Sequence, residues 1–349
     1  MSIFKATGQT TARTGQHILG GLGIFAVPIL LALSPAYGQP PERESVSARI
    51  ERVAARHVGR LGIAAQEIGG QEIVAINGNE RFVMASSYKV AIATAVLDRV
   101  DKGELRLDQL VNVTLDQMVA GDNVIAEQFV HPGLQLSVAN LIEAMITESD
   151  NTATDLCMEL AGGPAAVTRK LRSIGITNQR VDRPVAEGLR DFYRLPAPAR
   201  ASVAAEFFKN NPAQLAAAIQ LKPNPAFEQD PRDQTTPLAM LELLLAIDNG
   251  QALSPASRQF LLGSMSRTRT GADRLKGLLP KGTPVAHKTG TIGGVANDVG
   301  YITLPDGRRF AIAVYTNSSE TPVADRDRAI AEAARMLYDY FYLEPVAKR

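Results

Sequence analysis

Residues 285–317 read VAHKTGTIGGVANDVGYITLPDGRRFAIAVYTN. Three stretches within this segment, 285–291, 296–304 and 309–317, are rich in Val, Ile, Thr and aromatic residues. Runs of this kind bounded by turn residues are typical of β-strands, and Pro305-Asp306-Gly307 favours a tight turn between the last two. The segment therefore predicts three successive strands near the end of the chain.

A second group of strand patterns lies near the start of the chain. The runs 61–67 and 72–77 are separated by Gly69-Gly70, which predicts a hairpin. Amphipathic helix patterns lie at 44–56, before the hairpin, and at 323–342, after the last strand.

Helical patterns dominate the middle of the chain, so the strands come from its two ends. We therefore predict an α+β fold, an α/β sandwich whose sheet is built from both chain ends, with an all-helical lobe inserted. The expected sheet lobe comprises residues 39–100 and 265–349, and the expected helical lobe comprises 101–264.

The composition excludes several classes of function. With 37 Lys and Arg against 36 Asp and Glu among 349 residues, the charge gives no reason to expect a nucleic-acid partner. The single cysteine, Cys157, rules out an internal disulfide and a thiolate metal cluster. No two of the four histidines have the spacing of metal ligands, so we expect neither a metal nor another cofactor.

Residues 1–38 have the layout of a secretory signal peptide. A basic start precedes an apolar run of 16 residues, 18–33, and small residues precede an expected cleavage near Gly38. The run is shorter than the ~20 residues that span a bilayer. We therefore expect a periplasmic or secreted protein, residues 39–349, without stable membrane insertion.

Ser86-Ser87-Tyr88-Lys89 opens a helical pattern that is apolar on nearly every side. Ser86 and Lys89 are three residues apart, so they share one helical face. A buried lysine amine must be paired or deprotonated, and a neighbouring amine can activate a serine oxygen. The pattern indicates a nucleophilic serine assisted by a lysine.

Two further motifs complete the pattern. Ser149-Asp150-Asn151 lies in a polar break between two helical patterns, and Lys288-Thr289-Gly290-Thr291 lies on a predicted strand. The lysine and hydroxyls of the second motif suit an anionic group, and we expect Gly290 to let a substrate backbone approach the strand edge.

In this order and on these elements, the three motifs resemble the signature of class A β-lactamases and penicillin-binding proteins. The resemblance extends over nearly the whole chain after residue 38. It includes the segments 85–91, 147–153, 235–240 and 267–271. It implies a five-stranded antiparallel sheet flanked by helices, with the active site between the sheet and the helical lobe.

The resemblance also implies a role for each motif residue. Ser86 is the acylated nucleophile, Lys89 moves its proton, and Ser149 passes a proton to the leaving nitrogen. The backbone N–H groups of Ser86 and Thr291 form the oxyanion hole. The implied substrate-binding residues are Asn151, Lys288, Thr289, Gly290, Thr291 and Arg274.

Residues 180–234 depart from the family pattern in the segment that corresponds to its Ω-loop. Class A enzymes carry a glutamate two residues after the arginine that matches Arg183, and this glutamate activates the water that releases the product. Val185 stands in that place, so we expect Glu187 to act as a displaced general base.

The same segment is some 35 residues longer than the family's loop, with helix patterns at 199–209 and 212–221. Long loops with structure of their own are usually functional. This insertion either roofs the cleft and restricts large substrates or offers a docking surface to another chain.

The first functional hypothesis is hydrolysis of the β-lactam amide through a serine acyl-enzyme, giving antibiotic resistance. The expected partner is a small-molecule β-lactam, and we expect a monomer. A penicillin-binding D-Ala-D-Ala carboxypeptidase is the second hypothesis, favoured by the missing glutamate. The third is a β-lactam sensor that is acylated without hydrolysis.

Overall fold

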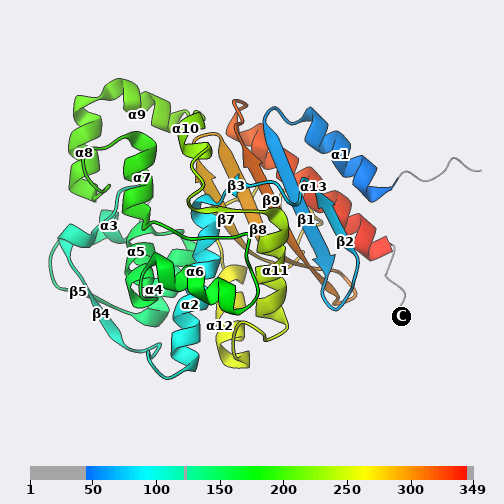
Figure 1. Ribbon diagram of the computed structural model, residues 1–349, viewed down its shortest axis with the longest axis horizontal. Coiled ribbons are helices and arrows are strands. Elements are labelled where there is room, and N and C mark those ends of the chain that lie inside the picture. The colour runs from blue at the N-terminus through cyan, green and yellow to red at the C-terminus, as the bar shows by residue number, and fades with distance from the viewer. Residues whose placement is uncertain (1–44, 122–123, 344–349) are drawn as a thin grey trace, which may run out of the picture. The chain divides into compact units, whose positions relative to one another are not determined.

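The computed structural model of the protein describes residues 45–121 and 124–343 (Figure 1). It contains a five-stranded antiparallel sheet with the order β2-β1-β9-β8-β7. The strands are β1 (Arg60–Glu67), β2 (Ile73–Ile76), β7 (Val285–Ile292), β8 (Val295–Thr303) and β9 (Arg309–Asn317). Because β1 pairs directly with β9, the predicted sheet built from both chain ends is confirmed.

The two faces of the sheet contribute to two hydrophobic cores. Alternate residues of a strand point to opposite faces. Ile63 and Ile312 accordingly pack with α1 (Val46–Arg56) and α13 (Val323–Leu343). Ala64, Ala313 and Tyr315 face the other core, which contains α2 (Lys89–Asp101) and α11 (Pro237–Asp248). The sheet therefore lies between two layers of helices (Figure 1).

Helices from the middle of the chain surround α2, whose residues Lys89–Leu97 are all buried. Side-chain caps begin several of them: Ser137 accepts from Asn140 N, and Asp150 accepts from Ala153 N. The helices of this region are α3 (Val124–Gln128), α4 (Val138–Thr147), α5 (Asn151–Leu160), α6 (Pro164–Ser173) and α12 (Pro255–Ser266), with the short 3-10 turns η1 (Ala85–Tyr88) and η2 (Leu115–Gln117).

Two short ribbons were not predicted from the sequence. They are β3 (Phe82–Val83) with β6 (Gln234–Thr235), and β4 (Leu110–Val113) with β5 (Leu134–Ser137).

The long Ω-loop segment is helical. It contains α7 (Val185–Tyr193), α8 (Ala201–Asn210), α9 (Pro212–Ile219) and α10 (Pro225–Glu228). The predicted helices at 199–209 and 212–221 are confirmed as α8 and α9, whereas α7 was not predicted. Across residues 45–121 and 124–343, every helix is too short or too polar to span a bilayer. The predicted signal peptide, residues 1–38, lies outside the described residues.

Candidate active site

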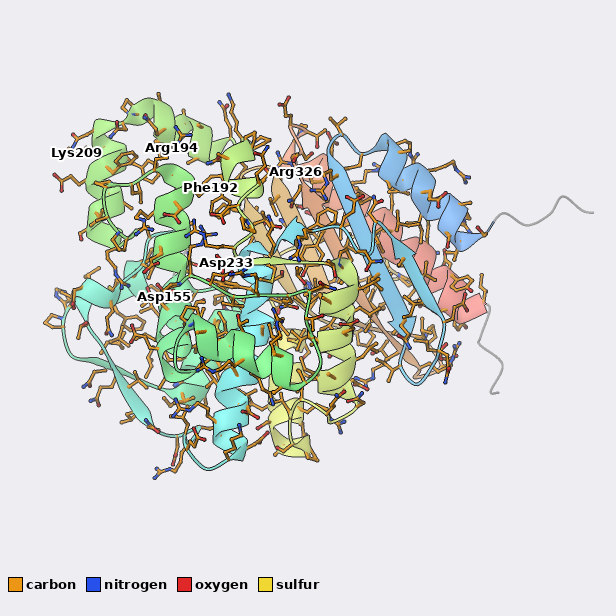
Figure 2. The ribbon with its side chains drawn as sticks, in the orientation of Figure 1. Asp155, Phe192, Arg194, Lys209, Asp233 and Arg326 are labelled. Atoms are coloured by element: carbon orange, nitrogen blue, oxygen red, sulfur yellow. The ribbon has the colours of Figure 1, made fainter. Side chains whose placement is uncertain are left out.

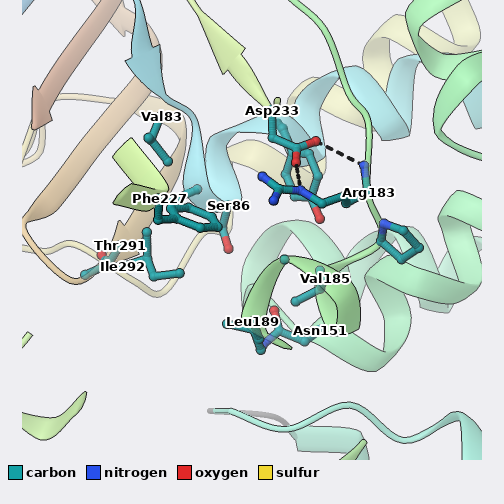
Figure 3. Close-up of a pocket in the computed structure, with 14 residues that line it drawn as sticks. Val83, Ser86, Asn151, Arg183, Val185, Leu189, Phe227, Asp233, Thr291 and Ile292 are labelled. Carbon is teal, nitrogen blue, oxygen red and sulfur yellow. Dashed lines mark hydrogen bonds and ion pairs between the residues drawn. The ribbon is translucent and has the colours of Figure 1, made fainter. Parts of the chain in front are cut away.

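The 3-10 turn η1 presents the predicted nucleophile. Ser87 is held in the core, because its Oγ donates to Met84 O at 2.8 Å and lies 3.1 Å from the Tyr315 hydroxyl. Ser86 instead lines two adjoining pockets, the smaller of which is drawn in Figure 3. Ala85 has φ +44°, a left-handed conformation that costs about 1–2 kcal/mol for a residue with a Cβ. Of the two serines, Ser86 is the one positioned for chemistry.

The helix expected to begin at Ser86 begins at Lys89 instead. Residues three apart in a 3-10 turn eclipse one another, so Ser86 and Lys89 still share one face. The difference matters for Ser86 itself, because it places the predicted nucleophile in a strained turn before the helix and not in its first regular turn.

Lys89 is completely buried among oxygen atoms of the turn before α5. Its Nζ donates to Ser149 O at 2.6 Å and to Asn151 Oδ1 at 2.9 Å, and it lies 3.2 Å from Ser149 Oγ. Burial lowers the pKa of Lys89 to about 7, against the opposing effect of the Asp150 carboxylate. Lys89 is therefore able to accept a proton near neutral pH.

Ser149 lies between two lysines. The Lys288 Nζ donates to Ser149 Oγ at 3.0 Å and to Thr289 O at 2.8 Å, and the Lys288 side chain is completely buried. Burial, followed by the charge of Lys89, lowers the pKa of Lys288 well below its ordinary value. Two ammonium groups on one hydroxyl disfavour each other, so a neutral Lys89 favours a charged Lys288. An anion bound beside Lys288 would favour that charged form further.

Gly290 brings strand β7 against the nucleophile turn. A Cβ at Gly290 would lie 2.6 Å from Met84 O and 3.1 Å from Ser86 N, so no larger residue fits without movement of the backbone. The neighbour that excludes a side chain here is η1, and the expectation that Gly290 lets a substrate backbone approach the strand edge stays a prediction.

Asn297 on β8 holds the same turn and was missed by the sequence reasoning. Its Nδ2 donates to Val83 O and to Met84 O, both at 2.9 Å, and the side chain is completely buried. Asn297 lies more than 200 residues from these carbonyls along the chain, and a lone asparagine on a strand carries no sequence signal for such a contact.

Arg274 and three threonines lie at one end of the larger pocket. The Arg274 Nε donates to Asp327 Oδ1, and its Nη2 donates to Thr291 Oγ1, both at 2.7 Å. The Thr289 and Thr270 hydroxyls are 2.5 Å apart. Arg274, Thr289 and Thr291 are thus brought together. The charge of Arg274 is paired with Asp327, and the threonine hydroxyls can donate hydrogen bonds to an anion.

The ends of the Ω-loop segment meet at Arg183 and Asp233. The Arg183 Nε donates to Asp233 Oδ2 at 2.6 Å, and Asp233 Oδ1 accepts from two backbone N–H groups (Figure 3). Arg183 Nη1 also lies 2.9 Å from Asp191 Oδ2. The two ends of the long insertion are therefore joined by one buried ion pair, between Arg183 and Asp233.

Asp155 on α5 determines where α7 begins, and sequence reasoning missed it. Its carboxylate accepts from Val185 N at 2.6 Å and from Ala186 N at 3.1 Å, which satisfies two free N–H groups of the first turn. Burial raises the pKa of Asp155 to about 6.

Glu187 lies in the first turn of α7 and is partly buried. It is not among the described residues that line the two pockets beside Ser86. Its assignment as the general base stays a prediction.

The two pockets share Ser86, Asn151 and Thr291 and form one cleft. In the smaller pocket Val185 and Leu189 lie across from Ser86 (Figure 3). Among its described lining residues Asp233 is the only carboxylate, and Arg183 binds it. The larger pocket has a volume of about 620 Å³, within the size range of ligand sites.

Comparison with known proteins gives consistent matches. The family model described as "Beta-lactamase enzyme family" matches residues 45–341. The extended-spectrum β-lactamase PER-1 of Pseudomonas aeruginosa is 30% identical over 91% of this chain and 94% of its own length. A β-lactamase structure from Chitinophaga pinensis has 30% identity and a TM-score of 0.70, covering 85% of this chain and 99% of the other. An ancestral class A β-lactamase (GNCA) has 35% identity and a TM-score of 0.70, covering 85% and 100%.

Proposed function

The chain belongs to the β-lactamase enzyme family as a class A serine β-lactamase, and from this premise we propose that it hydrolyses β-lactam antibiotics through an acyl-enzyme on Ser86 and thereby confers resistance. The observation that carries the proposal is the chain of contacts from Lys89 through Ser149 to Lys288 beside this serine.

Acylation needs a base, an oxyanion site and an acid for the leaving nitrogen. The neutral Lys89 amine takes the Ser86 proton, and Ser86 Oγ bonds to the lactam carbonyl carbon. The N–H groups of Ser86 and Thr291 stabilise the oxyanion, each donor contributing about 3 kcal/mol. The carbon–nitrogen bond then breaks, and the proton passes from Lys89 through Ser149 Oγ, 3.2 Å away, to the nitrogen.

The substrate carboxylate binds where Thr289, Thr291 and Arg274 line the cleft, and the buried Lys288 acts from behind this surface through Ser149. Gly290 keeps that strand against the nucleophile turn. Asn151 contacts the amide side chain of the substrate from the opposite side. Its place in both pockets, next to Ser86, supports this role.

Breakdown of the acyl-enzyme limits turnover. Val185 and Leu189 are apolar and cannot activate a water, and Asp233 is bound by Arg183. Glu187 is our proposed base for this step. Because it is not placed in the described lining of the cleft, we expect deacylation to be slower than acylation.

The experiment mixes purified residues 39–349 with a chromogenic cephalosporin and follows product and intact mass together. The expected result is a stoichiometric burst, a mass adduct on Ser86, and slower steady turnover that Ser86→Ala abolishes. Absence of both adduct and turnover would overturn the proposal. A permanent adduct without turnover would favour the penicillin-binding or sensor alternative.

Glu187→Gln tests the base, with Glu206→Gln on α8 as the matched control, because Glu206 is exposed and lines neither pocket. Accumulation of adduct in the first variant alone supports Glu187. Unchanged burst and turnover remove Glu187 from the mechanism, and equal loss of both rates indicates a folding defect.

We also propose that the protein acts as a monomer after export. The basic start and apolar run of residues 1–38 support export, and a single chain supplies every residue of the proposed site. Fractionation with N-terminal sequencing tests cleavage near Gly38, and light scattering tests the monomer.

A further inference from the structure

The inserted Ω-loop segment forms one side of the catalytic cleft. The larger pocket contains Ser86 and is also lined by residues of α8, α9 and the turn after α9. We call these residues the insertion wall: Phe208, Leu215, Ala218, Ile219 and Leu221. All five are apolar, so the wall offers hydrophobic contact and no hydrogen-bonding side chain.

Polar side chains from other elements also line the same pocket. Glu148, Ser149 and Asn151 line it from the helical region, and Thr270, Arg274 and the β7 threonines line it from the sheet. The cleft therefore has two chemically different sides, and a ligand that fits both combines an anionic or polar part with a large apolar part.

The apolar character of α9 is not explained by packing. None of its eight residues is buried, although seven of them are Pro, Ala, Leu or Ile. Leu215 is 40% exposed and Ile219 is 73% exposed. Exposed apolar surface that is continuous with a cleft commonly marks a ligand-binding site.

The insertion wall is held in place at both ends. At one end, Tyr193 of α7 packs edge-on against Phe192 and Phe208, with ring centroids 4.9 and 5.3 Å apart. At the other end, the buried Arg326 of α13 donates to Leu221 O at 3.3 Å and to Gly293 O at 2.7 Å (Figure 2). These contacts fix the wall relative to Ser86.

The β7–β8 turn closes the same end of the insertion. A Cβ at Gly293 would lie 2.6 Å from Lys222 O, and a Cβ at Gly294 would lie 2.8 Å from Pro223 Cγ. The turn and the insertion are therefore in direct backbone contact. This contact supports the alternative in which the insertion covers the cleft, and not the one in which it is a separate docking surface for another chain.

We propose that the insertion wall is a substrate-specificity site that binds a large apolar substituent of the β-lactam while the carboxylate lies at Arg274 and the β7 threonines. This inference rests on the proposed function. It predicts that penicillins with a bulky aryl side chain acylate Ser86 faster than the unsubstituted penicillin nucleus.

The test compares two penicillins on two variants. Nafcillin carries a naphthyl group, and 6-aminopenicillanic acid carries no acyl side chain; the second-order rate of Ser86 acylation is measured for each by quenched-flow mass spectrometry. The variant Leu215→Gln/Ile219→Gln replaces the two exposed large side chains of the insertion wall with a good helix former. The control Ala213→Gln/Ala216→Gln changes exposed positions of the same helix that do not line the cleft.

In the wall variant, the rate of acylation by nafcillin is expected to fall about tenfold, which is the size of effect that lost contacts in a hydrophobic pocket produce. The rate of acylation by 6-aminopenicillanic acid is expected to change less than about twofold. The control is expected to change neither rate. An unchanged ratio of the two rates in the wall variant, or an equal loss in the control, overturns the inference. Failure of both penicillins to acylate the unmodified protein would instead contradict the proposed function.

Discussion

Lys89 gives the most direct test of the chemistry, because its environment determines its protonation. The amine is completely buried, and burial lowers its pKa from 10.5 to about 7. A shift of this size corresponds to about 5 kcal/mol between the charged and neutral forms. Raising the pH through 7 should therefore convert Lys89 into the base that activates Ser86.

The expected pH profile follows from this pKa. The neutral fraction of Lys89 is roughly one tenth at pH 6 and roughly nine tenths at pH 8. The acylation rate at saturating substrate should therefore rise about tenfold between these values and then level off. Saturation removes the contribution that we propose Lys288 makes to substrate binding.

The assay is single-turnover acylation by stopped flow from pH 5.5 to 9.5, with Lys281→Met as the control because Lys281 is exposed. A rate that continues to rise tenfold per pH unit up to pH 9.5 would show that Lys89 keeps an ordinary pKa. A flat profile would show that Lys89 does not accept the proton. Either result would show that Lys89 is not a base with a lowered pKa.

The lowered pKa of Lys89 should also make the stability of the protein depend on pH. Between pH 7 and 10.5 the unfolded chain binds more protons at Lys89 than the native protein does, so the unfolding free energy rises with pH. From pH 7 to 9 this contribution amounts to about 2 kcal/mol, and Lys89→Met should lack it. Denaturant unfolding of both proteins at the two pH values measures the difference.

Three other predictions concern residues that shape the site. Gly290→Ala should lower acylation about 100-fold, because its Cβ meets Met84 O at 2.6 Å and displaces β7 from Ser86; the rate is compared with the melting temperature, and equal activity would contradict the close approach. Because a carboxyl with a raised pKa binds more protons in the native than in the unfolded state, Asp155 should lower the free energy of unfolding by about 3 kcal/mol as the pH rises from 4 to above 6. Asp155→Asn should remove this decrease; urea unfolding over this range measures it, and an unchanged pH slope would count against the assignment. Arg183→Met should destabilise the protein by about 3–5 kcal/mol by leaving Asp233 buried without its partner, whereas a change below about 1 kcal/mol in urea unfolding would show that the ion pair is dispensable.

Short-range patterns in the sequence predicted the elements that have a clear period. The strands of the sheet, the flanking helices α1 and α13, and the two insertion helices α8 and α9 were all expected from residues that are neighbours in the chain. Strand alternation and helical periodicity arise from local backbone geometry, so a single sequence carries them. The helix α7 was missed because its start depends on Asp155, 30 residues away. The ribbon of β3 and β6 was missed because its two strands are about 150 residues apart in the chain.

The residue pattern was enough to predict the fold class, the order of the three motifs and the residue types available for acyl transfer. The tertiary structure alone decided that Ser86 and not Ser87 faces the cleft, that burial among the Ser149 and Asn151 oxygens lowers the pKa of Lys89, and that the insertion lines the site. Burial, close backbone approach and the pKa of a side chain depend on atoms that are distant in sequence and adjacent in space. These properties therefore exist only in the folded chain and cannot be predicted from neighbouring residues.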